Sequence, residues 1–310
     1  SRHISGNMAA HRKAERALAA YVHQAQSALF STGYACNVGV VQSLVDGDDI
    51  VFSDRLNHAS LIDGARLSRG KVVIYEHADA TDLERKLRQH RGEGSGALVL
   101  TESLFSMDGD VPPLRDIAKL AREFDAGLLV DEAHALGVMG PDGRGLCAEL
   151  DVRPDVIIGT LGKAFGAQGA FAAANEQTIE LVRNRARSYI FSTAPAPALA
   201  AIATAALRLV RDANGLRDQL RARSLRLRAG LRELDYRVPE GVGPIIPIMI
   251  GESGPTMELS RALFDRGVFV HGVRPPTVPA GTGRLRVVPM ATHTDEDISQ
   301  ALRAFAEVRR

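Results

Sequence analysis

Cysteine and tryptophan are the scarcest residues of this chain, with two cysteines and no tryptophan among 310 residues. The two thiols, Cys36 and Cys147, lie far apart and outside any CxxC spacing, which excludes a disulfide framework and a cysteine-rich metal site. We therefore expect reduced thiols in a cytoplasmic protein. A chain of this length can bury a substantial core without a metal staple, so we also expect no bound metal.

Long apolar runs and an excess of charge of one sign are also missing. No apolar run approaches the ~18 residues that a membrane-spanning helix requires. Lysine and arginine number 38 against 37 acidic residues, which leaves a formal net charge of +1, and no long basic block occurs. We therefore expect no membrane partner and no nucleic-acid partner.

Short runs of valine, isoleucine and leucine alternate with amphipathic stretches through most of the chain. Runs that are apolar throughout predict strands buried on both faces, as in a largely parallel sheet. The expected strands are Asp49–Ser53, Lys71–Tyr75, Ala97–Thr101, Gly127–Val130, Val156–Gly159 and Gly169–Ala173, with helices at Thr81–His90, Pro113–Phe124 and Gln177–Arg187. This alternation is typical of an α/β fold.

A change of composition near Ser192–Pro197 marks the expected domain boundary. A long helical region rich in alanine, leucine and arginine follows, with a break near Asn214–Gly215. Strands and helices then alternate again, at Ile246–Ile250, Pro255–Arg266, Val268–Val270, Leu285–Val288 and Asp295–Val308. We predict a large domain over residues 1–195 and a smaller C-terminal α/β domain over residues 196–310.

Polar side chains follow three of the expected strands at the point where each strand ends. Asp131 and His134 follow one strand, Thr160 and Lys163 follow the next, and Ser106 follows a third. Functional groups of parallel sheets gather past the C-terminal ends of the strands. We therefore expect these five residues at one edge of one sheet.

Each of these residues also has an ordinary structural explanation when it is taken alone. A lysine after a strand is usually a solvated surface residue, Asp131 alone is more often a helix cap, and His134 can be a structural histidine. However, Gly162 and Ala164 predict a close-packed loop, in which a partly buried Lys163 has a lowered pKa and becomes a usable nucleophile and base. A carboxylate nearby could pair with the pyridinium nitrogen of pyridoxal 5′-phosphate (PLP), so the combination favours a PLP enzyme.

Three competing motifs fail on their spacing. Gly159–Ala164 resembles a phosphate-binding P-loop, but two residues separate its glycines where four are needed, and no hydroxyl follows the lysine. Asp131–His134 spells the DEAH box of some helicases, yet no P-loop accompanies it. Gly92–Ala97 precedes a strand instead of following one, so it cannot serve as a dinucleotide fingerprint.

Six segments together resemble successive signatures of the α-oxoamine synthases, in that family's order and spacing. They are Ser1–Asn7, Phe30–Asn37, Asp54–Ser60, Glu102–Asp110, Asp131–His134 and Gly159–Gly166. The tail Val273–Arg286 is most similar to the branch of the family that acts in biotin synthesis. The resemblance implies a PLP-dependent transferase of fold type I, the aspartate aminotransferase-like fold, and a homodimer with a shared active site.

The resemblance assigns a role to the residues nearest the cofactor ring. Lys163 would bond PLP covalently, and Asp131 would hold the ring nitrogen protonated. His134 and Ser106 would contact the phenolic side of the ring, and His58 would stack on its face. All five are therefore expected to be catalytic or cofactor-binding residues.

The remaining assignments concern the phosphate and the substrates. Gly33, Tyr34 and Thr160 would position the cofactor, with Thr160 at its phosphate. The hydroxyl of Thr193 would reach the phosphate of the neighbouring subunit. The substrate-binding residues would be His58, Thr277 and Arg286, of which Arg286 would hold the amino acid carboxylate with its planar guanidinium.

The implied activity is an acyl transfer in which L-alanine condenses with pimeloyl-CoA, or with its carrier-protein thioester, and CoA and CO2 are lost. Sister activities stay open: a 2-amino-3-ketobutyrate ligase, a 5-aminolevulinate synthase or a serine palmitoyltransferase-like enzyme. Glycine differs from alanine by one methyl group, which supplies only about 1–3 kcal/mol of discrimination. An NTP-driven nucleic-acid protein lacks its P-loop here, and the intact Lys163 argues against a non-catalytic PLP-fold subunit.

Two features depart from the family pattern. Members of the family carry a further segment before the match to Ser1–Asn7, and that segment normally helps to bind the acyl chain. Ala135 and Leu136 follow the histidine where the enzymes of the biotin branch usually have glycine and a small residue. Neither departure touches the residues that carry the PLP chemistry.

Overall fold

The computed structural model describes residues 1–309, which form two compact units. The first unit comprises Ser1–Leu104 and Val111–Ala213, and the second comprises Phe105–Asp110 and the chain from Asn214 onward. This grouping differs from the expected division at residue 195. The difference arises because helix α9 (Pro197–Arg211) packs against helix α1 (Ala9–Tyr21) of the first unit.

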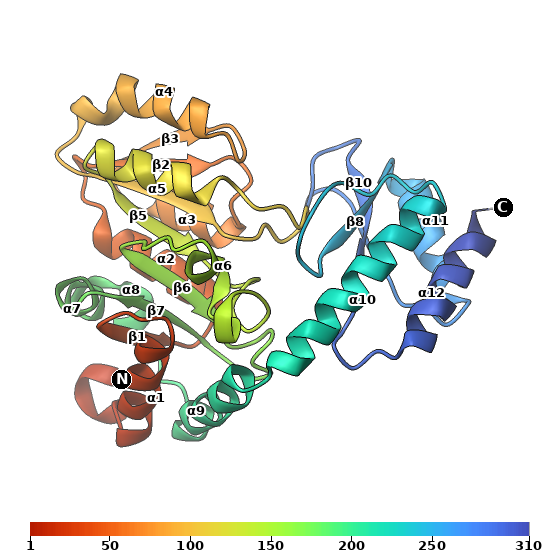
Figure 1. The fold of residues 1–310 in the computed structure, drawn as a ribbon. Coiled ribbons are helices and arrows are strands. Elements are labelled where there is room, and N and C mark those ends of the chain that lie inside the picture. The colour runs from red at the N-terminus through yellow and green to blue at the C-terminus, as the bar shows by residue number, and fades with distance from the viewer. Residues whose placement is uncertain (310) are drawn as a thin grey trace. The chain divides into compact units, whose positions relative to one another are not determined.

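A seven-stranded sheet forms the centre of the first unit, in the order β1-β7-β6-β5-β4-β2-β3 (Figure 1). Neighbouring strands from β3 to β6 are parallel, whereas β7 runs antiparallel to both β6 and β1. The strands are β1 (Gln26–Phe30), β2 (Ile50–Asp54), β3 (Lys71–Tyr75), β4 (Ala97–Glu102), β5 (Gly127–Asp131), β6 (Val156–Thr160) and β7 (Ala170–Ala174). The expected α/β fold with a mostly parallel sheet is confirmed.

Helices cover both faces of this sheet. One face packs against α2 (Gly33–Leu44), α3 (Ala59–Leu67), α7 (Glu176–Arg185) and α8 (Arg187–Ile190), and the other packs against α1 and α9. Both faces are covered because successive apolar side chains of a strand point to opposite faces of the sheet. In β1, Ala28 and Phe30 face the first group of helices and Leu29 faces the second. Helix α4 (Ala80–His90) contacts β2 and β3, and helix α5 (Leu114–Glu123) contacts β5. The short α6 (Gly145–Glu149) precedes β6.

Strand β1 is absent from the sequence-based prediction. Its first two residues, Gln26 and Ser27, are polar, so only three apolar residues mark the run. The strand forms because it pairs with β7 at the edge of the sheet, with Gln26 opposite Ala174 and Phe30 opposite Ala170. A partner distant in the sequence therefore determines this strand.

A three-stranded antiparallel sheet in the order β8-β10-β9 forms the centre of the second unit. Its elements are α10 (Asn214–Glu233), β8 (Ile246–Gly251), α11 (Ser253–Phe264), β9 (His271–Val273), β10 (Gly283–Val287) and α12 (Asp295–Val308). The expected strand at Val268–Val270 is displaced, because the Val268 amide still bonds the Leu263 carbonyl at the end of α11. Among residues 1–309, no helix is both long and apolar enough to cross a membrane.

Candidate active site

The strand order places the C-terminal ends of β4, β5 and β6 side by side. Glu102, Asp131 and Thr160 are the last residues of these three strands, and Glu102 is the register partner of Asp131. Register partners on neighbouring parallel strands carry their side chains on the same face of the sheet. Lys163 and His134 follow in the loops after β6 and β5, so four of the five predicted residues gather at this edge. The fifth, Ser106, belongs to the second unit.

Two donors hold the Asp131 carboxylate, which is only 6% exposed. Asn37 of α2 donates its Nδ2 to Oδ2 at 2.7 Å, and the backbone N–H of Ala133 donates to Oδ1 at 2.9 Å. An ionised carboxylate offers about four lone-pair sites, so both oxygens retain capacity for a further, charge-assisted hydrogen bond. Asp131 is thus oriented by the fold before any ligand binds.

Lys163 lies in the turn between β6 and β7, with its Nζ 2.9 Å from His134 Nε2. The turn is fixed by its backbone, because Gly166, at φ +59°, donates its N–H to the Lys163 carbonyl at 3.0 Å. Phe165 packs into the core, but Lys163 and Ala164 are exposed. The expectation of a close-packed loop that partly buries Lys163 is therefore wrong, since small neighbours leave the amine accessible.

His58 is the N-cap residue of α3, and its side chain is tied to Asp131 through two intermediates. Its Nδ1 lies 2.6 Å from Ser60 Oγ and accepts the Ser60 N–H at 3.2 Å. Asn37 Nδ2 donates to Ser60 Oγ at 2.9 Å and also to Asp131. The imidazole predicted to stack on the cofactor and the carboxylate predicted to pair with it therefore belong to one hydrogen-bond network.

Gly33, the first residue of α2, lies beside Thr160. A Cβ atom built on Gly33 would lie 3.8 Å from Thr160 Oγ1. Thr32 caps this helix of 12 residues by accepting the Ala35 N–H at 3.0 Å. The positive end of a helix next to a hydroxyl is a favourable position for a phosphate group.

Tyr34 and Thr193 are exposed residues of the first unit. The Tyr34 hydroxyl donates to Asp63 Oδ2 at 2.8 Å, and this bond to a carboxylate raises the pKa of Tyr34. Thr193 lies between α8 and α9. The cofactor contacts expected of both residues stay predictions.

Ser106, Thr277 and Arg286 belong to the second unit. The half-buried Arg286 donates from Nε to the Ser106 carbonyl at 2.7 Å, and burial lowers the pKa of its guanidinium. Within residues 1–309, its two outer nitrogens make no hydrogen bond or ion pair, so a bidentate acceptor can reach them. Thr277 is exposed, in the loop before β10.

The sequence reasoning missed Glu102, a buried acid at the end of β4. Its Oε1 accepts the backbone N–H of His58 at 2.6 Å, and 3% of the residue is exposed. Burial, together with the negative charge of Asp131, raises the pKa of Glu102 well above its usual range. An acidic residue that directly ends an apolar strand run is the signal that could have identified it.

Glu132, the neighbour of Asp131, was also missed. Its carboxylate is fully buried and accepts the Ser103 hydroxyl at 2.7 Å and the backbone N–H groups of Leu146 and Cys147 at 3.1 and 2.6 Å. Burial raises the pKa of Glu132 despite these donors. Glu132 thereby fastens the loop after β5 to α6.

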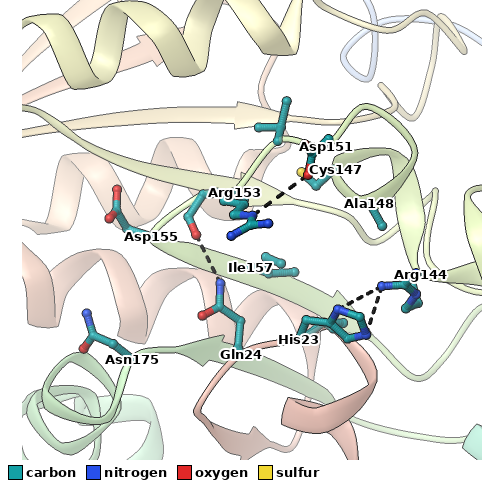
Figure 2. Close-up of a pocket in the computed structure, with 13 residues that line it drawn as sticks. His23, Gln24, Arg144, Cys147, Ala148, Asp151, Arg153, Asp155, Ile157 and Asn175 are labelled. Atoms are coloured by element: carbon teal, nitrogen blue, oxygen red, sulfur yellow. Dashed lines mark hydrogen bonds and ion pairs between the residues drawn. The ribbon is translucent and has the colours of Figure 1, made fainter.

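A separate pocket of about 580 Å³ lies at the opposite end of β6 (Figure 2). Its charged groups largely contact one another. Arg144 Nη1 lies 3.0 and 3.1 Å from the two ring nitrogens of His23, and Arg153 Nε lies 3.9 Å from Asp151 Oδ1. None of the predicted site residues lines it, so the edge of the sheet that carries Lys163 is the candidate active site.

The residues at that edge fit PLP. An accessible amine can bond the cofactor, a buried and pre-oriented carboxylate can pair with the ring nitrogen, and the N-terminus of α2 beside Thr160 can take the phosphate. The fold and the site together therefore define a PLP-dependent enzyme.

Comparison with known proteins leads to the same class. The family model described as aminotransferase class I and II matches residues 1–305, and the chain belongs to this family. An 8-amino-7-oxononanoate synthase of Geotalea daltonii is 44% identical over 315 residues, a match that covers 100% of this chain and 80% of the relative.

Solved structures with the same fold include two kinds of enzyme. A serine palmitoyltransferase from S. paucimobilis with a bound PLP–myriocin aldimine is 32% identical, with a TM-score of 0.95, and covers 99% of this chain and 78% of that one. An 8-amino-7-oxononanoate synthase from Francisella tularensis is 27% identical, with a TM-score of 0.84, over 97% and 88% of the two chains. The expected α-oxoamine synthase resemblance, the PLP-dependent transferase fold, the acyltransferase class and the cofactor are confirmed.

Proposed function

We propose that this protein condenses L-alanine with pimeloyl-CoA, or with the corresponding carrier-protein thioester, to give 8-amino-7-oxononanoate, CoA and CO2 in biotin synthesis. The observation that carries the proposal is the similarity, along the whole chain, to relatives that bear this name. The similarity of the tail Val273–Arg286 to the biotin branch supports the same choice.

PLP, when bound, supplies an electron-accepting ring that stabilises negative charge on the substrate Cα. Lys163 would hold the cofactor, and its Nζ would remove and return the proton at that carbon. His134, 2.9 Å from this nitrogen, would orient it. Asp131 would keep a proton on the ring nitrogen, because its carboxylate is buried and already held by Asn37 and Ala133.

The other residues would bind and orient the reactants. Gly33 and Thr160 would contact the phosphate, with Tyr34 alongside, and His58 would lie against the ring face. Ser106 would contact the phenolic side of the ring. Each of these roles is carried over from the family to the matching position.

Arg286 and Thr277 would face the amino acid and the thioester. The outer nitrogens of Arg286 suit a carboxylate, because a guanidinium fork forms two parallel charge-assisted bonds. Its Nε bond to the Ser106 carbonyl fixes the direction of the fork. In this proposal Arg286 selects for an α-carboxylate and does not read the length of the acyl chain.

The fold likeness to serine palmitoyltransferase favours one alternative, a sister enzyme that uses another amino acid or thioester. The deciding experiment compares kcat/KM for pimeloyl-, succinyl-, acetyl- and palmitoyl-CoA with alanine, glycine and serine, by following thiol release. A preference for alanine and the pimeloyl thioester is expected. A clear preference for another pair would assign the protein to a sister activity.

We also propose a homodimer with a shared active site, in which the Thr193 hydroxyl reaches the phosphate bound by the neighbouring subunit. The family resemblance and the exposure of Thr193 support this assembly. Sedimentation of the active protein tests it, and an active monomer would contradict it. A cytoplasmic location fits the two buried free thiols, Cys36 and Cys147.

A further inference from the structure

Five residues from β4, β5, α2 and α3 form a continuous hydrogen-bond network at the candidate active site. It runs from Glu102 to the backbone of His58, from the His58 ring to Ser60, and from Ser60 through Asn37 to Asp131. Every bond in it is between 2.6 and 2.9 Å. The two ends of the network, Glu102 and Asp131, are register partners on neighbouring strands.

Backbone and amide donors fix the direction of the other bonds in this network. The backbone N–H of Ser60 can only donate, so His58 Nδ1 is the acceptor in that contact. Asn37 Nδ2 donates to Ser60 Oγ, and this oxygen lies 2.6 Å from His58 Nδ1.

We propose that Glu102 is a positioning residue of this site, which fixes the start of α3 and so sets the His58 ring relative to Asp131. The inference rests on the cofactor-contact roles proposed above for His58 and Asp131. What Glu102 supplies is one acceptor for a backbone N–H that begins a helix and would otherwise lack a partner there.

The role of Glu102 requires an acceptor oxygen and does not require a charge. Glu102 and Asp131 are register partners on neighbouring strands, and two buried carboxyls close to one another do not both ionise readily. Burial and Asp131 raise the pKa of Glu102 first, Asp54 on β2 adds to the effect, and Lys163 and the His58 N–H oppose it. A neutral acid still accepts a hydrogen bond through its carbonyl oxygen, so the position of His58 does not depend on a charge at residue 102.

Two variants separate the acceptor from the charge. Glu102→Gln keeps a carbonyl oxygen and the side-chain volume, whereas Glu102→Met keeps the volume and removes the acceptor. The dissociation constant of PLP and the visible circular dichroism of the bound cofactor are measured for each. We expect Glu102→Gln to stay within about 2-fold of wild type and Glu102→Met to bind PLP roughly 10-fold more weakly, because a buried N–H is left unsatisfied.

A double-mutant cycle with His58→Ala then tests whether Glu102 acts through His58. In that background the ring is absent, so Glu102→Met should change PLP affinity by less than about 2-fold. The ring-nitrogen shifts of ¹⁵N-labelled His58 in the apo protein provide a readout independent of the cofactor, and they should move in Glu102→Met only. Glu15→Gln is the matched control, since Glu15 is another buried glutamate that accepts a backbone N–H, from Leu29, outside this network. It should lower stability without changing PLP affinity.

Several outcomes would overturn the inference. If Glu102→Gln and Glu102→Met lose the same PLP affinity, the charge of Glu102 is the important feature and the inference is wrong. If Glu102→Met loses the same PLP affinity with and without the His58 ring, Glu102 does not act through His58. Should Glu102→Met fail to fold, a Glu102→Gln protein with weakened PLP binding contradicts the inference by itself. If His58→Ala binds PLP normally, the proposed role of His58 is wrong as well. If His58→Ala binds PLP weakly but Glu102→Met binds it normally, only the inference about Glu102 is contradicted.

Discussion

The two units of the molecule place their functional groups in different ways. In the first unit, Glu102, Asp131 and Thr160 end neighbouring parallel strands, so the strand order alone brings them together. In the second unit the sheet is antiparallel, and Arg284 and Arg286 project from one face of its middle strand, β10. Functional residues can therefore be predicted from the C-terminal ends of strands in the parallel sheet, but not in the antiparallel one.

Within the second unit, the two arginines of β10 differ in what they contact. Arg284 is buried, donates from Nε to the Thr282 carbonyl at 3.0 Å and forms an ion pair with Asp108. Arg286 is half-buried and, among the described residues, is held through Nε alone. The first arginine stabilises the unit, whereas the second has its outer nitrogens available for a ligand.

The largest expected effect is the loss of turnover when Lys163 in the first unit is replaced by alanine. No other described residue at the edge of the sheet offers an amine that can bond the cofactor. Borohydride treatment of the PLP-loaded protein, followed by peptide mapping, should place a pyridoxyl group on Lys163 in wild type and on no residue in the variant. Lys119→Ala, at an exposed position of α5, is the control and should retain both label and activity. A label on another lysine would contradict the assignment.

The next largest effect is expected for Asp131→Asn. Asparagine keeps the volume and one acceptor, but it cannot stabilise a positive charge on the ring nitrogen, so chemistry should suffer more than binding. We expect kcat to fall at least about 100-fold, equivalent to about 2.7 kcal/mol of barrier, while PLP still binds. Steady-state kinetics and the absorbance of the bound cofactor measure the two effects separately. A variant with near-normal kcat and bound PLP would show that Asp131 is not the ring partner.

A smaller effect should distinguish the two arginines of the second unit. Arg286→Lys keeps the charge but loses the fork, so we expect KM for the amino acid to rise roughly 10- to 100-fold, in line with the 1.5–3 kcal/mol typical of charged hydrogen bonds, with less change in kcat. Arg284→Lys should instead lower the melting temperature and leave KM close to wild type. Kinetics and thermal unfolding of both variants test this. If Arg284→Lys raises KM and Arg286→Lys only lowers the melting temperature, Arg284 and not Arg286 binds the substrate.

The comparison of the units also explains how much the sequence could predict. Apolar runs in the sequence predicted most strands of the first unit, because local hydrophobicity determines where buried parallel strands end. The position after these runs then identified Asp131, His134, Thr160 and Lys163 as candidate site residues. The edge strand β1 was missed because its polar start offers no such run and its pairing with β7 is distant in sequence. Glu102 was missed because its importance lies in its contacts with His58 and Asp131, which only the folded arrangement creates.

The smallest expected effect is a pH dependence of stability that is confined to the first unit. Glu102 has a folded-state pKa raised by burial and by Asp131, so the folded state holds its proton more tightly than the unfolded chain does. The stability that this proton contributes is fully present below the ordinary glutamate pKa of about 4.3 and is lost as pH rises through the raised value, by about 1.4 kcal/mol for each unit of difference. Wild type should therefore unfold more readily as the pH is raised above that ordinary value.

Glu102→Gln cannot ionise, so its unfolding free energy should fall less steeply with pH than that of wild type. Glu132→Gln is the contrasting variant, because its new amide N–H2 would face the N–H and hydroxyl donors that now converge on the carboxylate, and it should destabilise the protein at every pH. Chemical denaturation of the apo protein from pH 5 to pH 9 measures both variants. Hydrogen-exchange protection factors locate the effect, which should weaken β4 and β5 with rising pH and leave β8 and β10 unchanged. No carboxyl group with a raised pKa is resolved among the described residues of the second unit. A wild-type protein whose β4 protection is independent of pH would show that Glu102 is ionised throughout this range.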